Sequence, residues 1–155
     1  MKKRSSLLLV GALAVLITSA VVSVHARAAE SYDAALQTFR LVGDVNETLV
    51  TTLPTDLARG SAPKDLLEVF SAAVRREDAA WDALTAARPW WGAFGVGEDQ
   101  RVLGAAMQER DAMRNVQSVM QQLAVTSPDA WSPHIAALRD SIDMFVSGHV
   151  MVMRK

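Results

Sequence analysis

Beyond residue 29, apolar residues recur at a spacing close to 3.6 residues almost to the end of the chain. This spacing places them on one face of an α-helix, and no stretch alternates like a half-buried β-strand between hairpin turns. The first such face consists of Tyr32, Ala35, Phe39, Val42, Leu49 and Leu53. The last and most regular one consists of Ile135, Leu138, Ile142, Phe145, His149 and Val152. The pattern therefore predicts an all-α fold.

Prolines divide this pattern into segments. Pro54 ends the first predicted helix, and the composition of residues 54–63, PTDLARGSAP, is typical of a loop. Pro63 suits the first turn of a second helix, which ends before Pro89. The faces of the second and third helices consist of Leu66, Phe70, Ala73, Ala80, Leu84 and Ala87, and of Val102, Ala106, Met113, Val116, Met120 and Leu123.

Two further boundaries complete the division. Glu98 supplies an acidic group favoured in a first helical turn, so we expect the third helix to begin there. Ser132 and Pro133 form an N-cap and first-turn pair for the fourth helix, and residues 127–128, also Ser-Pro, suit an earlier turn. Four helices with short connections favour an antiparallel up-down-up-down four-helix bundle over residues 29–155. The competing fold is a three-helix core with one helix lent to a partner.

The first 28 residues have a different character. Lys2, Lys3 and Arg4 precede an apolar run at 7–17 that extends to residue 24, and Ala26 and Ala28 match the small residues of a signal-peptidase site. The longer run would form a helix of roughly 27 Å, just enough to cross a bilayer. Residues 1–28 are thus predicted to be a signal peptide or a membrane anchor. Both place the domain in the bacterial periplasm or cell envelope, anchored to the inner membrane through residues 7–24 if uncleaved.

Composition excludes several classes of protein. The whole chain carries a formal charge of −1, and the basic residues of its first 28 positions leave the rest acidic. An acidic domain without a basic stripe argues against nucleic acid as a partner. The chain contains no cysteine, which excludes disulfides, thiolate metal sites, covalently attached haem and a lipid anchor on cysteine.

The segment 87–97, ARPWWGAFGVG, joins the second and third helices and places Trp90, Trp91 and Phe94 among glycines. Three roles stay open for it. The rings could lie in the lipid headgroup zone of an adjacent membrane, or bind a protein partner, as tryptophan often does at interfaces. They could also fold back and plug the open end of the bundle.

Polar residues interrupt two of the apolar faces. Glu77 and Glu109 each lie about 11 residues from the tryptophan segment, so in an antiparallel hairpin they stand at similar height. Facing carboxylates raise each other's pKa unless a cation intervenes, and Arg76 and Arg110 are the candidates. Glu77, Glu109 and Arg110 are therefore predicted to form a polar layer that either binds a small ligand or fixes the helix register. Asn46 is expected about 10 Å away from them.

His149 is the other candidate for chemistry. With Met153 one turn beyond it, His149 could ligate Cu(I), and alone it could ligate haem b. The haem hypothesis resembles the four-helix cytochromes in fold only, since no methionine stands near Tyr32 where their second ligand lies. The simpler interpretation is a partly buried, hydrogen-bonded histidine. Neither Glu-x-x-His nor His-Glu-x-x-His occurs, which argues against di-iron and zinc-protease sites.

No serine lies within helical reach of a histidine as a nucleophile, and no phosphate-binding loop is present. We therefore expect a non-enzymatic exported protein that acts by binding, as an envelope adaptor, a ligand-sensing module or an accessory subunit of a complex. A protein partner is expected. The alternative is a haem- or copper-binding periplasmic carrier that uses His149.

Overall fold

A computed structural model describes residues 32–87 and 98–154, which form four long α-helices and no β-strand. They are α2 (Tyr32–Ala58), α3 (Pro63–Ala86), α4 (Glu98–Val125) and α5 (Ser132–Met153). A short 3₁₀ helix, η2 (Pro128–Ala130), precedes α5. The predicted all-α, four-helix class is confirmed. The predicted signal or anchor, residues 1–28, and the candidate loop residues Trp90, Trp91 and Phe94 lie outside the described ranges.

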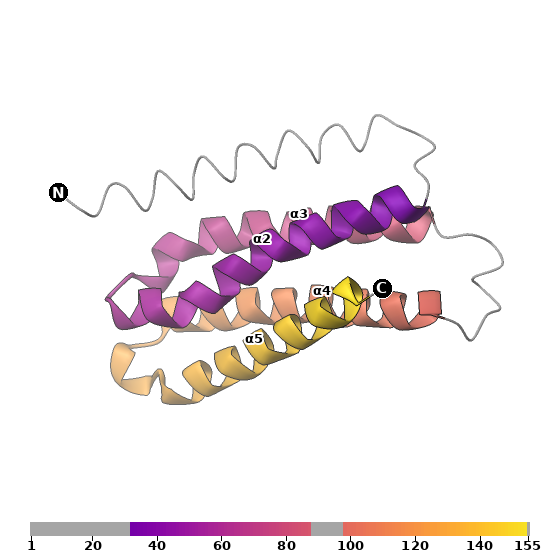
Figure 1. Ribbon diagram of the computed structural model, residues 1–155. Coiled ribbons are helices and arrows are strands. Elements are labelled where there is room, and N and C mark those ends of the chain that lie inside the picture. The colour runs from indigo at the N-terminus through magenta and orange to yellow at the C-terminus, as the bar shows by residue number, and fades with distance from the viewer. Residues whose placement is uncertain (1–31, 88–97, 155) are drawn as a thin grey trace.

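The helices pack in cyclic order. α2 contacts α3 and α5, and α4 contacts the same two helices, whereas α2 and α4 meet only briefly across the centre. Each helix runs antiparallel to the one before it, with the α2–α3 pair lying over the α4–α5 pair (Figure 1). The end of α3, the start of α4 and the start of α2 therefore share one end of the bundle. Within the described residues, no helix is apolar over a length that would span a membrane.

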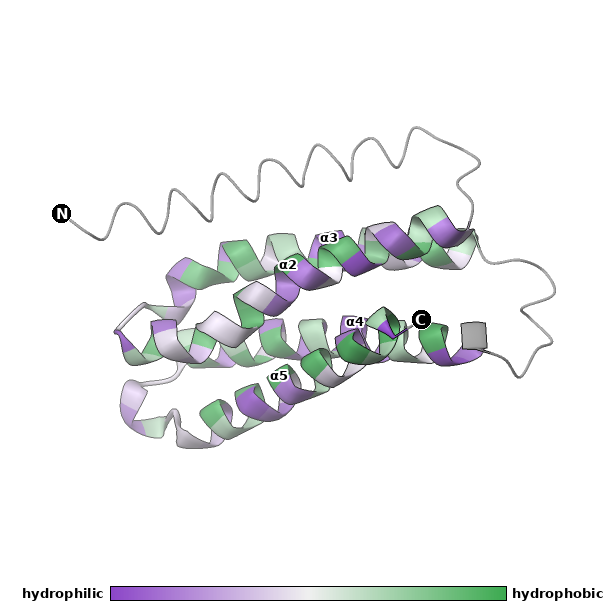
Figure 2. Cartoon of the chain, viewed as in Figure 1, coloured by the Kyte–Doolittle hydropathy of each residue, from purple (hydrophilic) through white to green (hydrophobic). Residues whose placement is uncertain are grey.

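Hydrophobic and hydrophilic residues alternate along every helix (Figure 2), and the buried apolar residues form two separate clusters. We call the cluster nearer the α2–α3 turn the lower cluster. It contains Val50, Leu53, Phe70, Met113, Met120, Leu123, Leu138 and Phe145 among others. We call the cluster nearer the start of α2 the upper cluster. It contains Leu36, Phe39, Val42, Leu84, Val102, Ala106 and Val152 among others. Burial of these faces supplies the main stabilisation of the helices. Polar residues lie between the two clusters.

The predicted end of the first helix at Pro54 is wrong, because α2 continues through this proline to Ala58. Pro54 removes one helical hydrogen bond, but Leu53 and Leu57 on either side are both buried in the lower cluster. Apolar burial outweighs the lost bond. The real turn is at Gly60, whose φ of 87° and backbone bonds, Gly60 N to Leu57 O and Ser61 N to Asp56 O, make a Schellman ending.

The other boundaries follow the sequence more closely. Pro63 lies in the first turn of α3, α4 begins at Glu98, and the expected earlier turn before α5 is η2. Ser132 is not the N-cap, however, since α5 already includes it and Trp131 occupies the capping position. The Trp131 indole Nε1 donates to the carbonyl of Thr126 at 2.9 Å.

Candidate functional site

One polar side chain from each helix enters the space between the two apolar clusters. Asn46 of α2, Glu77 of α3 and Glu109 of α4 are fully buried, and His149 of α5 is 2% exposed. We call these four residues the polar layer. Charged and amide groups are rarely buried without partners, because burying an ion without them costs on the order of several kcal/mol of hydration free energy. Their hydrogen bonds therefore decide how the layer is built.

The polar layer contains two direct hydrogen-bonded pairs. His149 Nδ1 lies 3.1 Å from Glu109 Oε1, which joins α5 to α4. Asn46 Nδ2 donates to Glu77 Oε2 at 2.6 Å, which joins α2 to α3. The expectation that Asn46 lies apart from the glutamates is therefore wrong. Asn46 reaches Glu77 because α2 continues four residues past Pro54 before the chain turns.

The two glutamates of these pairs both have raised pKa values. Burial first, and then the charge of Glu109, raise the pKa of Glu77 well above its usual range. Burial also raises the pKa of Glu109, although the bond and charge of His149 oppose the rise. Glu77 Oε1 and Glu109 Oε2 are buried and have no hydrogen-bond partner among the described residues. Protonation of one carboxyl, which the raised pKa values favour, would let it donate to the other and satisfy both oxygens.

His149 is held on both sides of its ring. Its Nε2 lies 3.0 Å from Asp44 Oδ1 and 4.0 Å from Glu47 Oε2, and the ring stacks on Phe145 one turn earlier. Burial lowers the pKa of His149, but the hydrogen bonds and charges of Glu109 and Asp44 outweigh it and raise the pKa to about 9. These neighbours therefore favour the protonated ring at neutral pH.

Two glycines make this arrangement possible. A Cβ on Gly43 would collide with Glu109 Oε1 and with the His149 ring, so only glycine at this position leaves room for the pair. A Cβ on Gly148 would lie 3.0 Å from the Glu109 backbone nitrogen, so this glycine permits the close approach of α4 and α5. The sequence singles out neither position, because both are ordinary helical glycines until the neighbouring helix is placed.

The two candidate counter-charges lie at the edge of the layer or outside it. Arg76 Nη2 donates to Asn46 Oδ1 at 3.5 Å, and burial lowers the pKa of Arg76. Arg110, predicted as a member of the layer, instead binds Asp78 at 2.9 Å and lies over the Trp81 ring. The structure therefore brings Glu77 and Glu109 together as predicted, without Arg110.

Asp44 and Glu47 were not among the residues that sequence reasoning selected. They are three residues apart on α2 and so lie on one face of that helix, beside the buried Asn46. That spacing was the available signal, but only the packing of α5 against α2 shows that His149 faces them. Met153, the thioether proposed to accompany His149, is 45% exposed in the last turn of α5.

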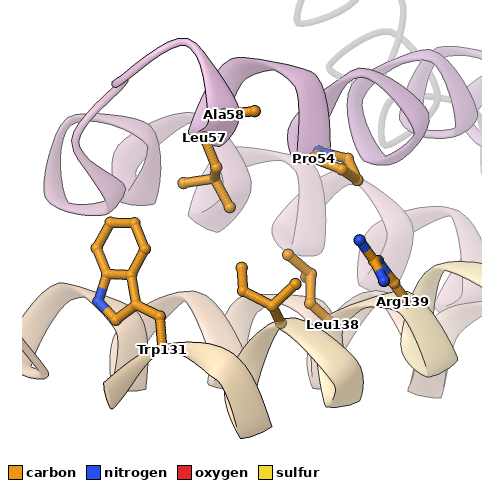
Figure 3. Close-up of a pocket in the computed structure, with 7 residues that line it drawn as sticks. Pro54, Leu57, Ala58, Trp131, Leu138 and Arg139 are labelled. Atoms are coloured by element: carbon orange, nitrogen blue, oxygen red, sulfur yellow. The ribbon is translucent and has the colours of Figure 1, made fainter. Parts of the chain in front are cut away.

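A groove lies away from the polar layer, between the end of α2 and the start of α5 (Figure 3). This apolar groove has a volume of about 250 Å³, and Trp131 closes its end. Its lining consists of Pro54, Leu57, Ala58, Trp131, Ile135, Leu138 and Arg139. The one charged group there, Arg139, offers no acid–base or ligand set.

No protein-family model matches this chain, and neither does a curated protein or a solved structure. The chemistry of the site therefore has to be read from its own residues. At the exposed end of the layer, the imidazole of His149 and the carboxylates of Asp44 and Glu47 are groups that could hold a cation.

Proposed function

We propose that this protein is an exported, non-enzymatic helical bundle that acts by binding, as a ligand-sensing module or accessory subunit in the cell envelope. One observation carries the proposal: buried polar groups of all four helices meet in one layer, and His149 links that layer to the exposed Asp44. Such a layer generally costs stability relative to apolar packing. It makes the packing of every helix depend on a group that a ligand can reach.

Export is the second part of the proposal. The basic start, apolar run and small residues of positions 1–28 support it. A sensor or adaptor of this size would pass its state to a protein partner, and Trp90 and Trp91 are the proposed contact with that partner or with the membrane. The acidic domain supports a protein partner rather than nucleic acid.

The alternative, a carrier that uses His149, is favoured in a modified form by the surroundings of Nε2. Oxygen ligands from Asp44 and Glu47 lie there, whereas Cu(I) prefers thioethers and thiolates. Haem would have to displace Asp44 and Glu47 from Nε2, whereas a divalent ion would use both carboxylates as ligands. The donor set therefore supports a divalent ion better than haem b or Cu(I).

Native mass spectrometry on protein extracted gently from its own host's envelope tests the proposal. We expect the wild-type chain to carry a bound ion, small molecule or protein partner that Glu109→Gln loses and Glu68→Gln, an exposed change on α3, retains. A wild-type chain with nothing bound, or the same occupancy in all three proteins, would contradict it. The same spectrum reports the N-terminus: a mass beginning near Ala29 means cleavage, and a full-length mass means an anchor.

A further inference from the structure

We propose that Asp44, Glu47 and His149 form a binding site for one divalent transition-metal ion of the Zn²⁺ class. The three side chains each direct one ligand atom to the same place, and these atoms all lie within 4.8 Å of one another. Two come from one face of α2 and the third from α5. The inference deepens the proposed binding function by naming the ligand, and its role in sensing rests on that function.

The spacing of the ligand atoms suits a metal ion. Zinc bonds to imidazole nitrogen and carboxylate oxygen are about 2.0–2.2 Å long, so ligand atoms around a tetrahedral ion lie roughly 3.3–3.6 Å apart. His149 Nε2 lies 3.0 Å from Asp44 Oδ1 and 4.0 Å from Glu47 Oε2, one distance slightly below and the other slightly above that spacing. Small rotations of the two acidic side chains would bring the three ligand atoms to that spacing, and the ion would take the place of the Nε2 proton, which is released to solvent.

A buried carboxylate on the second ring nitrogen orients His149 toward the proposed site. Metal-bound histidines usually place their second ring nitrogen against a carboxylate, which fixes the ring and strengthens it as a ligand. Glu109 Oε1 occupies this position at 3.1 Å from Nδ1, and it is fully buried. Gly43 leaves the space for the pair, and Phe145 stacks against the ring. The Nε2 atom is therefore aimed at Asp44 and Glu47 by three buried neighbours.

Charge and access fit a cation. Three carboxylates, those of Asp44, Glu47 and Glu109, surround a single imidazole, so the site has an excess of negative charge. The side chains of Asp44 and Glu47 are 50% and 36% exposed, so an ion can enter from solvent and keep water in its open positions. One nitrogen and two oxygens form a borderline donor set, which favours Zn²⁺ or Co²⁺ over the hard Mg²⁺.

The chain offers a matched control on α3. Asp65 and Glu68 have the same three-residue spacing as Asp44 and Glu47 and are exposed, and neither makes an ion pair with a histidine among the described residues. If exposed acid pairs alone bound the ion, both pairs would matter equally. The comparison isolates the contribution of His149 without changing a buried residue.

The test is calorimetric titration of the full chain, freed of metal with EDTA, using Zn²⁺, Co²⁺ and Mg²⁺ in turn. We expect one equivalent of Zn²⁺ or Co²⁺ to bind, with Kd at least tenfold weaker in Asp44→Asn and in Glu47→Gln and unchanged in Asp65→Asn and Glu68→Gln. Bound Co²⁺ should broaden the imidazole NMR signals of His149 and leave those of His134 sharp. Equal Kd values in all variants, or unaffected His149 signals, overturn the site.

Failure of the site and failure of the proposed function are distinguishable. A chain that binds no Zn²⁺ or Co²⁺ but leaves the envelope with an organic ligand or protein partner that Glu109→Gln loses overturns the metal site alone. A chain that binds neither metal nor any other ligand overturns both.

Discussion

His149 Nδ1 lies 3.1 Å from Glu109 Oε1, and this buried contact joins the last two helices at the boundary between the two apolar clusters. The contact gives a histidine inside an apolar core a charged partner, and it leaves Nε2 directed toward the surface. The pH response predicted below and the proposed metal site both rest on this contact.

Gly43→Ala should destabilise the protein by about 2–4 kcal/mol, because its Cβ would displace Glu109 Oε1 or the His149 ring. Gly104→Ala is the matched control. It adds the same methyl group to an exposed helical position with nothing within 4 Å, and should stabilise by about 0.5–1 kcal/mol. Urea unfolding measures both, and equal effects would show that Gly43 does not make room for the pair.

Glu109→Gln should lower the pKa of His149 from about 9 by at least about one unit. The substitution keeps a hydrogen-bonding group but removes the charge that opposes the effect of burial. NMR titration of the imidazole nitrogens measures the change. An unchanged His149 titration would mean that Asp44 alone supports the charge.

Stability of the metal-free protein should fall as the pH rises from 6.5 to about 9. Folding raises the pKa of His149, so in this window the folded state keeps a proton that the unfolded chain has released. The contribution is complete below pH 6.5, is lost as pH passes about 9, and is on the order of 3 kcal/mol. Urea unfolding in EDTA across this range should show a steep decline in wild type and a shallower one in Glu109→Gln. Identical slopes would contradict the assignment.

Asn46 and Glu77 should be strongly coupled in a double-mutant cycle. Asn46→Leu alone leaves Glu77 Oε2 buried without its donor and should cost about 1–3 kcal/mol. Glu77→Met alone leaves the buried Asn46 Nδ2 without its acceptor. The double variant should lose less than the sum of the two, because both partners of the bond are then replaced by apolar groups. Additive losses would show that the bond contributes little.

Replacing Trp90 and Trp91 with alanine tests the role of the segment that joins α3 to α4. If the rings contact a partner or the membrane, sedimentation with envelope membranes or recovery of the partner should fall while the melting temperature stays nearly constant. A large drop in melting temperature would instead show that the rings plug the bundle. Trp81→Phe, at the edge of the upper cluster, is the control: it replaces a tryptophan outside this segment and should leave recovery of the partner or membrane unchanged.

Local physics is enough to predict the helical architecture from the sequence. A 3.6-residue apolar period defines which face of each helix is buried, and proline at a first turn defines where α3 begins. The same period places Glu77, Glu109 and His149 on inner faces, and all three are buried. These properties depend on neighbours a few residues away along the chain, so the chain itself determines them.

The tertiary structure decided the rest. Asn46 lies about 12 residues before the end of α2, and Glu77 about 14 residues after the start of α3, so the two meet only because α2 continues past Pro54. That continuation depends on the burial of Leu57 against other helices, which no local pattern records. Likewise, His149 faces Asp44, Glu47 and Glu109 through contacts 40 to 105 residues apart in sequence. How helices turn and slide against one another is a property of their packing, and the candidate site exists only at that level.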